Sequence, residues 1–143
     1  MDDLVQWLHK QLDEDERIAR AATWHDDAGT WTAEASKYTS KRRREPRQFI
    51  IDSMDDGVIT DVDAEASEPE GVARHIAEHD PARALREVDA KRRLLSDFAP
   101  MLAQADALIE GEWNSNDDLH GRLLAYLTLP YADRPGYREE WRP

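Results

Sequence analysis

Apolar side chains recur at every third or fourth position at the start of the chain, which is the spacing of one face of an α-helix. Leu4, Leu8 and Leu12 share this face, and isoleucine and alanine residues continue it further along the chain. Acidic residues precede the pattern and can cap its first turn. The pattern therefore predicts an amphipathic helix over about residues 3–22.

The helical spacing then gives way to short runs that are rich in tryptophan, threonine, valine and isoleucine, within residues 23–63. Gly29 separates two such runs, which predicts a first β-hairpin. Asp55-Asp56-Gly57 joins two β-rich runs within "QFIIDSMDDGVITDVDAE", and an Asp-Gly pair between strands predicts a second hairpin because glycine tolerates positive φ. An acidic loop is expected to follow at about 61–70.

Helical spacing returns with a short helix at about 71–79. Proline disfavours the α conformation in the residue before it, and it is well accepted at the first position of a helix. Asp80-Pro81 therefore predicts that one helix ends and another begins, with Asp80 as the N-cap of a helix that continues to about residue 98. Pro100 is predicted to kink or break that helix before further helical segments.

The predicted fold class is α+β, with a small antiparallel β-sheet of hairpins packed against the N-terminal helix and several C-terminal helices. A chain of 143 residues fits one domain, so residues 1–143 are predicted to form a single domain. A helical region at about 71–129 precedes an aromatic tail at 130–143. Three large rings of this tail are expected to pack on the body of the protein: Tyr131, Tyr137 and Trp141.

Two charged residues lie on the apolar faces of their predicted helices. At 100° per residue, Asp15 falls in the arc of the leucines of the first helix, and Arg92 falls in the arc of Leu85, Val88 and Leu95. A buried charge without a partner is costly, so phase alone predicts an ion pair between Asp15 and Arg92. The alternatives are that the first helix stops packing before Asp15, or that Arg92 extends along the surface to reach water.

The net charge of −12 narrows the choice of partners because much of it lies in one segment. Residues 48–80 contain ten acidic side chains and one arginine, and this excess repels duplex nucleic acid, which binds through cationic side chains. A protein partner with basic character is expected instead. The run Lys41–Arg44 with Arg47 could hold a phosphate, but a short cationic run in a polar loop is more often a solvated connection.

The chain contains no cysteine, which excludes disulfides and thiolate chemistry. No apolar run approaches the ~20 residues of a membrane span, and the chain starts with acidic residues where a signal peptide has basic ones. We therefore expect a soluble, cytoplasmic protein without membrane association. The sequence leaves its oligomeric state open.

His75 and His79 are one helical turn apart and can share a face, which makes them candidates for a metal site. Asp80 would be the next ligand, and His25 a further one. The glutamate that metalloproteases place directly after the first histidine is replaced by Ile76. The sequence therefore favours a helix junction over a metal site, and no cofactor is expected.

Three stretches together closely resemble an uncharacterised family of small proteins that streptomycetes, related actinobacteria and their phages encode. The stretches are "LDEDERIARAATW", "HIAEHDPARALREVDAKRRLL" and "PYADRPGYREEWRP". They cover both ends and the centre of the chain. The resemblance implies an organismal context, with a possible link to phages or mobile elements, and it implies no activity.

Three classes of function stay open. The acidic middle segment favours a non-enzymatic interaction or accessory module that contacts another protein. The alternative is a small-ligand or metal binder at the helix junction, with a site formed by His75, His79, Arg83, Trp24 and Trp31. A hydrolase that uses His79 and a carboxylate is least favoured, because no serine lies in a Gly-x-Ser-x-Gly elbow and no glycine run matches a phosphate loop.

Overall fold

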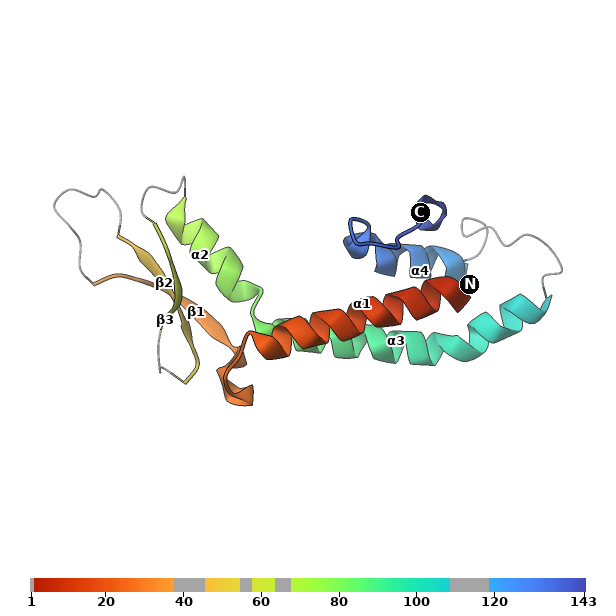
Figure 1. The fold of residues 1–143 in the computed structure, drawn as a ribbon, viewed down its shortest axis with the longest axis horizontal. Helices are drawn as coiled ribbons and strands as arrows, with labels where there is room; N and C mark the ends of the chain where they lie inside the picture. The colour runs from red at the N-terminus through yellow and green to blue at the C-terminus, as the bar shows by residue number, and fades with distance from the viewer. Residues whose placement is uncertain (1, 38–45, 55–57, 64–67, 109–118) are drawn as a thin grey trace. The chain divides into compact units, whose positions relative to one another are not determined.

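Figure 1 shows the computed structural model, which describes residues 2–37, 46–54, 58–63, 68–108 and 119–143. The helices of these residues are α1 (Asp2–Ala21), α2 (Pro69–Glu78), α3 (Pro81–Leu108) and α4 (Leu119–Thr128). The strands are β1 (Trp31–Ala35), β2 (Gln48–Asp52) and β3 (Val58–Val62). The α+β fold class is confirmed. Within the described residues, no helix combines the length and the apolar character that crossing a membrane requires.

The chain divides into two compact units. The helical unit contains Met1–Asp15 and Glu87–Pro143, and the sheet unit contains Glu16–Arg86. Each unit has a cluster of buried apolar side chains of its own. The single domain that chain length suggested stays a prediction.

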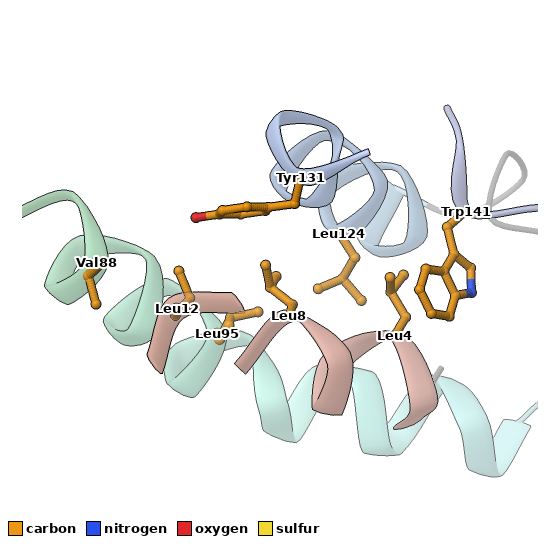
Figure 2. Packing of buried hydrophobic residues seen from close by; sticks show 8 residues of the cluster. All are labelled: Leu4, Leu8, Leu12, Val88, Leu95, Leu124, Tyr131 and Trp141. Carbon is orange, nitrogen blue, oxygen red and sulfur yellow. The ribbon is translucent and has the colours of Figure 1, made fainter. Parts of the chain in front are cut away.

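The core of the helical unit combines side chains from α1, α3, α4 and the C-terminal tail (Figure 2). Leu4, Leu8 and Leu12 are each at most 1% exposed, which confirms the apolar face predicted for the first helix. Full burial of one leucine contributes about 1.5–3 kcal/mol relative to exposure. The other buried members of this core are Val88, Leu95, Leu124, Tyr131 and Trp141.

The aromatic tail packs on α1 through Trp7, as the three rings of the tail predicted. The Trp7 ring lies 5.7 Å from that of Tyr137 and 5.4 Å from that of Trp141, between ring centroids. Its Nε1 donates a hydrogen bond to the Pro135 carbonyl at 3.2 Å. Gly136 follows with φ of 85°, and a Cβ there would lie 3.0 Å from the Trp7 nitrogen. Glycine therefore permits the turn that brings the tail onto the helix.

The predicted pair between Asp15 and Arg92 is corrected, because the structure gives each residue another partner. Arg134 of the tail donates to Asp15 Oδ1 at 2.5 Å, and the Tyr131 hydroxyl donates to Asp15 Oδ2 at 2.8 Å. Arg92 donates to Asp13 at 2.6 Å. Helical phase placed Asp15 on an inward face, where it is indeed half-buried. Phase could not show that the tail, over a hundred residues away in sequence, supplies the cation.

Tyr131 lies at the centre of this polar cluster. Its hydroxyl donates to Asp15 and accepts from Lys91 Nζ at 3.0 Å. Burial of the ring raises the pKa of Tyr131 well above the ordinary tyrosine value, and the hydrogen bond to the Asp15 carboxylate raises it further. Arg134 lies over the ring, 4.8 Å from its centroid, and partly offsets this effect on the pKa. The cluster satisfies a half-buried carboxylate and fixes the start of the tail.

In the sheet unit, β2 pairs antiparallel with β1 on one side and with β3 on the other. The pairing of β2 with β3 confirms the second predicted hairpin, while its turn at 55–57 lies outside the described residues. α2 covers one face of the sheet (Figure 1). Ile50 of β2, Val62 of β3 and Ala73 of α2 form a small buried core between them.

The first predicted hairpin is wrong. Asp26–Gly29 forms a 3₁₀ turn whose start is capped by His25, because His25 Nδ1 accepts from the Asp27 amide at 3.1 Å. Short polar side chains that hydrogen-bond to the nearby backbone favour such turns over strands. The strand that follows, β1, pairs with β2 instead of with an earlier run. Gly29 lies against the first turn of α3, where a Cβ would be 3.4 Å from the Ala82 amide nitrogen.

Two other boundaries differ from the sequence prediction. An acidic loop was expected at 61–70, but β3 continues to Val62 and α2 begins at Pro69. Residues 64–67 of this loop lie outside the described part. α3 contains Pro100 and continues to Leu108, so the helix end expected at about residue 98 is wrong. Good helix formers on both sides of Pro100 favour this continuation despite the lost backbone hydrogen bond.

Candidate functional site

A groove of about 1160 Å³ lies between β1 and α2 in the sheet unit. We call it the β1–α2 groove; its lining residues fall within 31–35, 46–48 and 68–80. Small side chains leave this space open. Ala33 and Ala35 line it from the sheet, and Gly71 and Ala77 line it from the helix. These four positions provide no bulk that would close the groove over the strand.

The outer edge of β1 borders the groove and has no neighbouring strand in the described part of the chain. Ser36, directly after β1, donates its amide to the Arg47 carbonyl at 2.7 Å. Backbone direction alternates along a strand, so the even-numbered residues of β1 direct their N–H and C=O groups toward β2. The odd-numbered residues direct theirs outward. Ala33 and Ala35 therefore present donors and acceptors along this edge that have no partner among the described residues.

Asp80 occupies one end of the edge. Its Oδ2 accepts from the outward Trp31 amide at 3.1 Å, and its Oδ1 accepts from the Arg83 amide at 2.7 Å. The second bond is that of an N-cap at the start of α3, so the cap predicted from Asp80-Pro81 is confirmed. Asp80 is 7% exposed. One carboxylate thus joins the start of β1 to the junction between α2 and α3.

Carboxylates outnumber cations in the lining of the groove. Among the lining residues that the structure describes, Glu68, Glu70, Glu78 and Asp80 accompany one cation, Arg74. Arg74 pairs with Glu78 at 2.8 Å, and the hydrogen bond from Arg74 lowers the pKa of Glu78. Glu68 and Glu70, at the other end of α2, form no ion pair within the described residues. The groove is therefore negative, most strongly beside the first turn of α2.

Trp31 contributes a half-buried ring to the lining. Its Nε1 is buried and finds no acceptor among the described residues. A buried donor without a partner costs on the order of 1–3 kcal/mol. The described lining residues offer hydrogen-bonding and ionic contacts.

The whole chain, residues 1–143, matches the family model of DUF6221, a family of unknown function. The chain belongs to this family. No curated protein and no solved structure matches it. Membership of DUF6221 agrees with the resemblance to an uncharacterised family, and it assigns no activity to the groove.

The histidine pair of this DUF6221 chain lies outside the groove lining. The rings of His75 and His79 are 4.3 Å apart between centroids, and both residues are exposed. His79 Nδ1 lies 2.8 Å from the His75 carbonyl oxygen, which fixes it as the protonated nitrogen. Both oxygens of Asp80 already accept backbone hydrogen bonds. In the part of the chain that the structure describes, no third ligand joins the two histidines.

The other residues predicted for a ligand site are also dispersed. Arg83 donates to the Glu78 carbonyl at 3.1 Å, at the C-terminal end of α2. Trp24 is 59% exposed and donates to Asp52 at 3.1 Å. Of the five predicted ligand-binding residues, Trp31 alone is among those that line the groove.

Sequence reasoning missed the carboxylates of α2 and the two alanines of β1. Glu68 and Glu70 belong to the acidic segment at 48–80, so their charge was visible, but their position beside a strand edge was not. The signal for Ala33 and Ala35 is their alternation with polar residues in "WTAEA", which places two small side chains on one face of a strand.

Proposed function

We propose that this protein is a non-enzymatic interaction module, and that the β1–α2 groove binds a basic segment of another protein. The observation that carries the proposal is the charge of the described lining residues, where four carboxylates accompany one arginine. A ligand with lysine or arginine side chains would supply the missing counter-charges. The resemblance to actinobacterial and phage proteins supports a cytoplasmic accessory or regulatory role within this proposal.

The strength of such binding follows from where the carboxylates lie. Glu68 and Glu70 are exposed, and an exposed ion pair contributes roughly 0.2–1 kcal/mol. Charge alone therefore gives weak affinity. Hydrogen bonds to the backbone of the β1 edge and contacts with the apolar side chains of the lining must add to it. Because exposed pairs are screened by salt, binding should weaken as ionic strength rises.

Selection from a random peptide display library on the immobilised full chain tests the proposal. We expect enrichment of peptides that contain lysine or arginine, and loss of their binding to a Glu68→Gln/Glu70→Gln variant. The matched control is Glu139→Gln/Glu140→Gln, which removes the same charge from the exposed tail and should bind like the wild type. Enrichment without cationic residues, or equal binding by both double variants, would contradict the proposal.

One further variant distinguishes binding in the groove from binding at the alternative site, the histidine pair. His79→Ala leaves the groove lining intact, so the selected peptides should bind it as they bind the wild type. A metal or small-molecule adduct that native mass spectrometry detects on the wild type, and that His79→Ala abolishes, would favour the alternative.

A further inference from the structure

We propose that the bound segment adds to the sheet as a fourth, antiparallel strand along the outer edge of β1. This inference rests on the proposed function and states how the groove would hold its ligand. The edge presents the N–H and C=O groups of Ala33 and Ala35, and nothing in the described part of the chain pairs with them. A peptide strand satisfies such groups directly, as in other cases of strand addition.

In the described residues, β1 itself lacks the features that usually protect an open strand. Proteins protect edge strands with proline, bulges or inward-pointing charges. β1 contains no proline, and its ladder with β2 is regular over five pairs. The ladder between β2 and β3 is irregular at Ile50/Ile51. α2 runs beside the β1 edge and provides a wall for an added strand, so this edge is the better acceptor.

The dimensions and the position of Asp80 set the register. A helix of ten residues such as α2 is ~15 Å long, and a strand rises ~3.4 Å per residue, so the groove holds about five residues of an extended segment. The Trp31 amide is already bonded to Asp80. Pairing must therefore stop at Trp31, and the added strand bonds to the Ala33 and Ala35 amides.

The face of the sheet determines which ligand side chains meet the carboxylates. Residues directly opposite one another in an antiparallel pair have side chains on the same face. Ala33 packs on the α2 side of the sheet, so the ligand residues that hydrogen-bond to β1 direct their side chains toward α2 as well. Lysine or arginine at these alternate positions reaches Glu68 and Glu70 over the small alanines. The expected ligand has basic residues at every second position.

The experiment uses an acetylated, amidated octapeptide of alternating lysine and valine as probe. Its affinity for the full chain is compared with that of two isomers, one N-methylated at every lysine and one at every valine. In the proposed register the lysine amides face β1, so methylation of the lysines should weaken binding at least about tenfold. Methylation of the valines, whose amides face away, should leave it within about twofold. The protein itself is unchanged, so misfolding cannot account for either result.

Hydrogen exchange of the protein's own backbone amides tests the same register. The Ala33 and Ala35 amides should exchange at least about tenfold more slowly with peptide bound. The Thr32 and Glu34 amides, which already face β2, should be little affected and act as internal controls. Equal loss of affinity with both isomers, or loss with the methylated valines, would overturn the antiparallel strand while leaving the proposed function standing. Absence of binding by the unmethylated peptide would contradict both.

Discussion

Replacement of Asp80 should destabilise the sheet unit through the loss of two hydrogen bonds whose contributions can be measured separately. Asp80→Ala removes the N-cap bond to the Arg83 amide and the bond to the Trp31 amide. Loss of an N-cap costs about 1 kcal/mol, and loss of a hydrogen bond to a charged group costs about 1.5–3 kcal/mol, so the sum is about 2–4 kcal/mol. Asp80→Asn keeps a capping oxygen but places an NH₂ group opposite the Trp31 N–H. Its cost should be that of the second bond alone.

Native-state hydrogen exchange of β1 and the first turn of α3 measures this difference within the sheet unit, and urea unfolding gives the total. Asp89→Asn is the matched control, because Asp89 lies on the same helix in an exposed pair with Arg93 and should change stability by less than about 0.5 kcal/mol. If Asp80→Asn is as stable as the wild type, the bond to Trp31 contributes nothing. If Asp80→Ala and Asp80→Asn are equal, the cap contributes nothing.

Two further predictions concern the helical unit. Because the pKa of Tyr131 is raised in the folded protein, its contribution to stability is complete below the ordinary tyrosine pKa of about 10 and is lost as pH rises above that value. The free energy of unfolding of Tyr131→Phe should therefore fall less at alkaline pH than that of the wild type. Absorbance titration of both proteins should show that the phenol absent from the variant ionises above pH 10 in the wild type. Gly136→Ala should cost at least about 1–2 kcal/mol in urea unfolding, because φ is positive and the new Cβ meets Trp7. Gly71→Ala, in α2 of the sheet unit, places a Cβ in ordinary contact with the Glu68 side chain and should cost nothing or stabilise.

The sequence predicted the elements whose signals are local. Leucines at helical spacing identified the buried face of α1, and the two β-rich runs at 48–52 and 58–62 identified a strand pair. Asp80 was recognised as an N-cap because aspartate before proline determines the end of one helix and the start of the next within a few residues. Each of these features depends on neighbours in sequence, so no knowledge of the fold was needed.

The features that sequence reasoning missed depend on distant parts of the chain. Asp15 was expected to meet Arg92, but its cation is Arg134, at a sequence separation of 119 residues. Several arginines could satisfy one inward carboxylate, and helical phase does not choose among them. The second bond of Asp80, to the Trp31 amide, is of the same kind. It requires the end of α2 and the start of β1 to be neighbours, which no local pattern indicates.

The needs of folding alone do not account for the negative charge of the groove. Carboxylates near the start of a helix are stabilised by its dipole, each by roughly 0.3–1 kcal/mol, and this could account for Glu70 in the first turn of α2. It does not account for a set of described lining residues in which Arg74 is the one cation and is already paired with Glu78. Neighbouring carboxylates repel one another, which offsets part of this stabilisation. A cationic segment at the edge of β1 would convert this repulsion into attraction, and the Glu68→Gln/Glu70→Gln variant should then stay within about 1 kcal/mol of the wild type in stability while it loses the ligand.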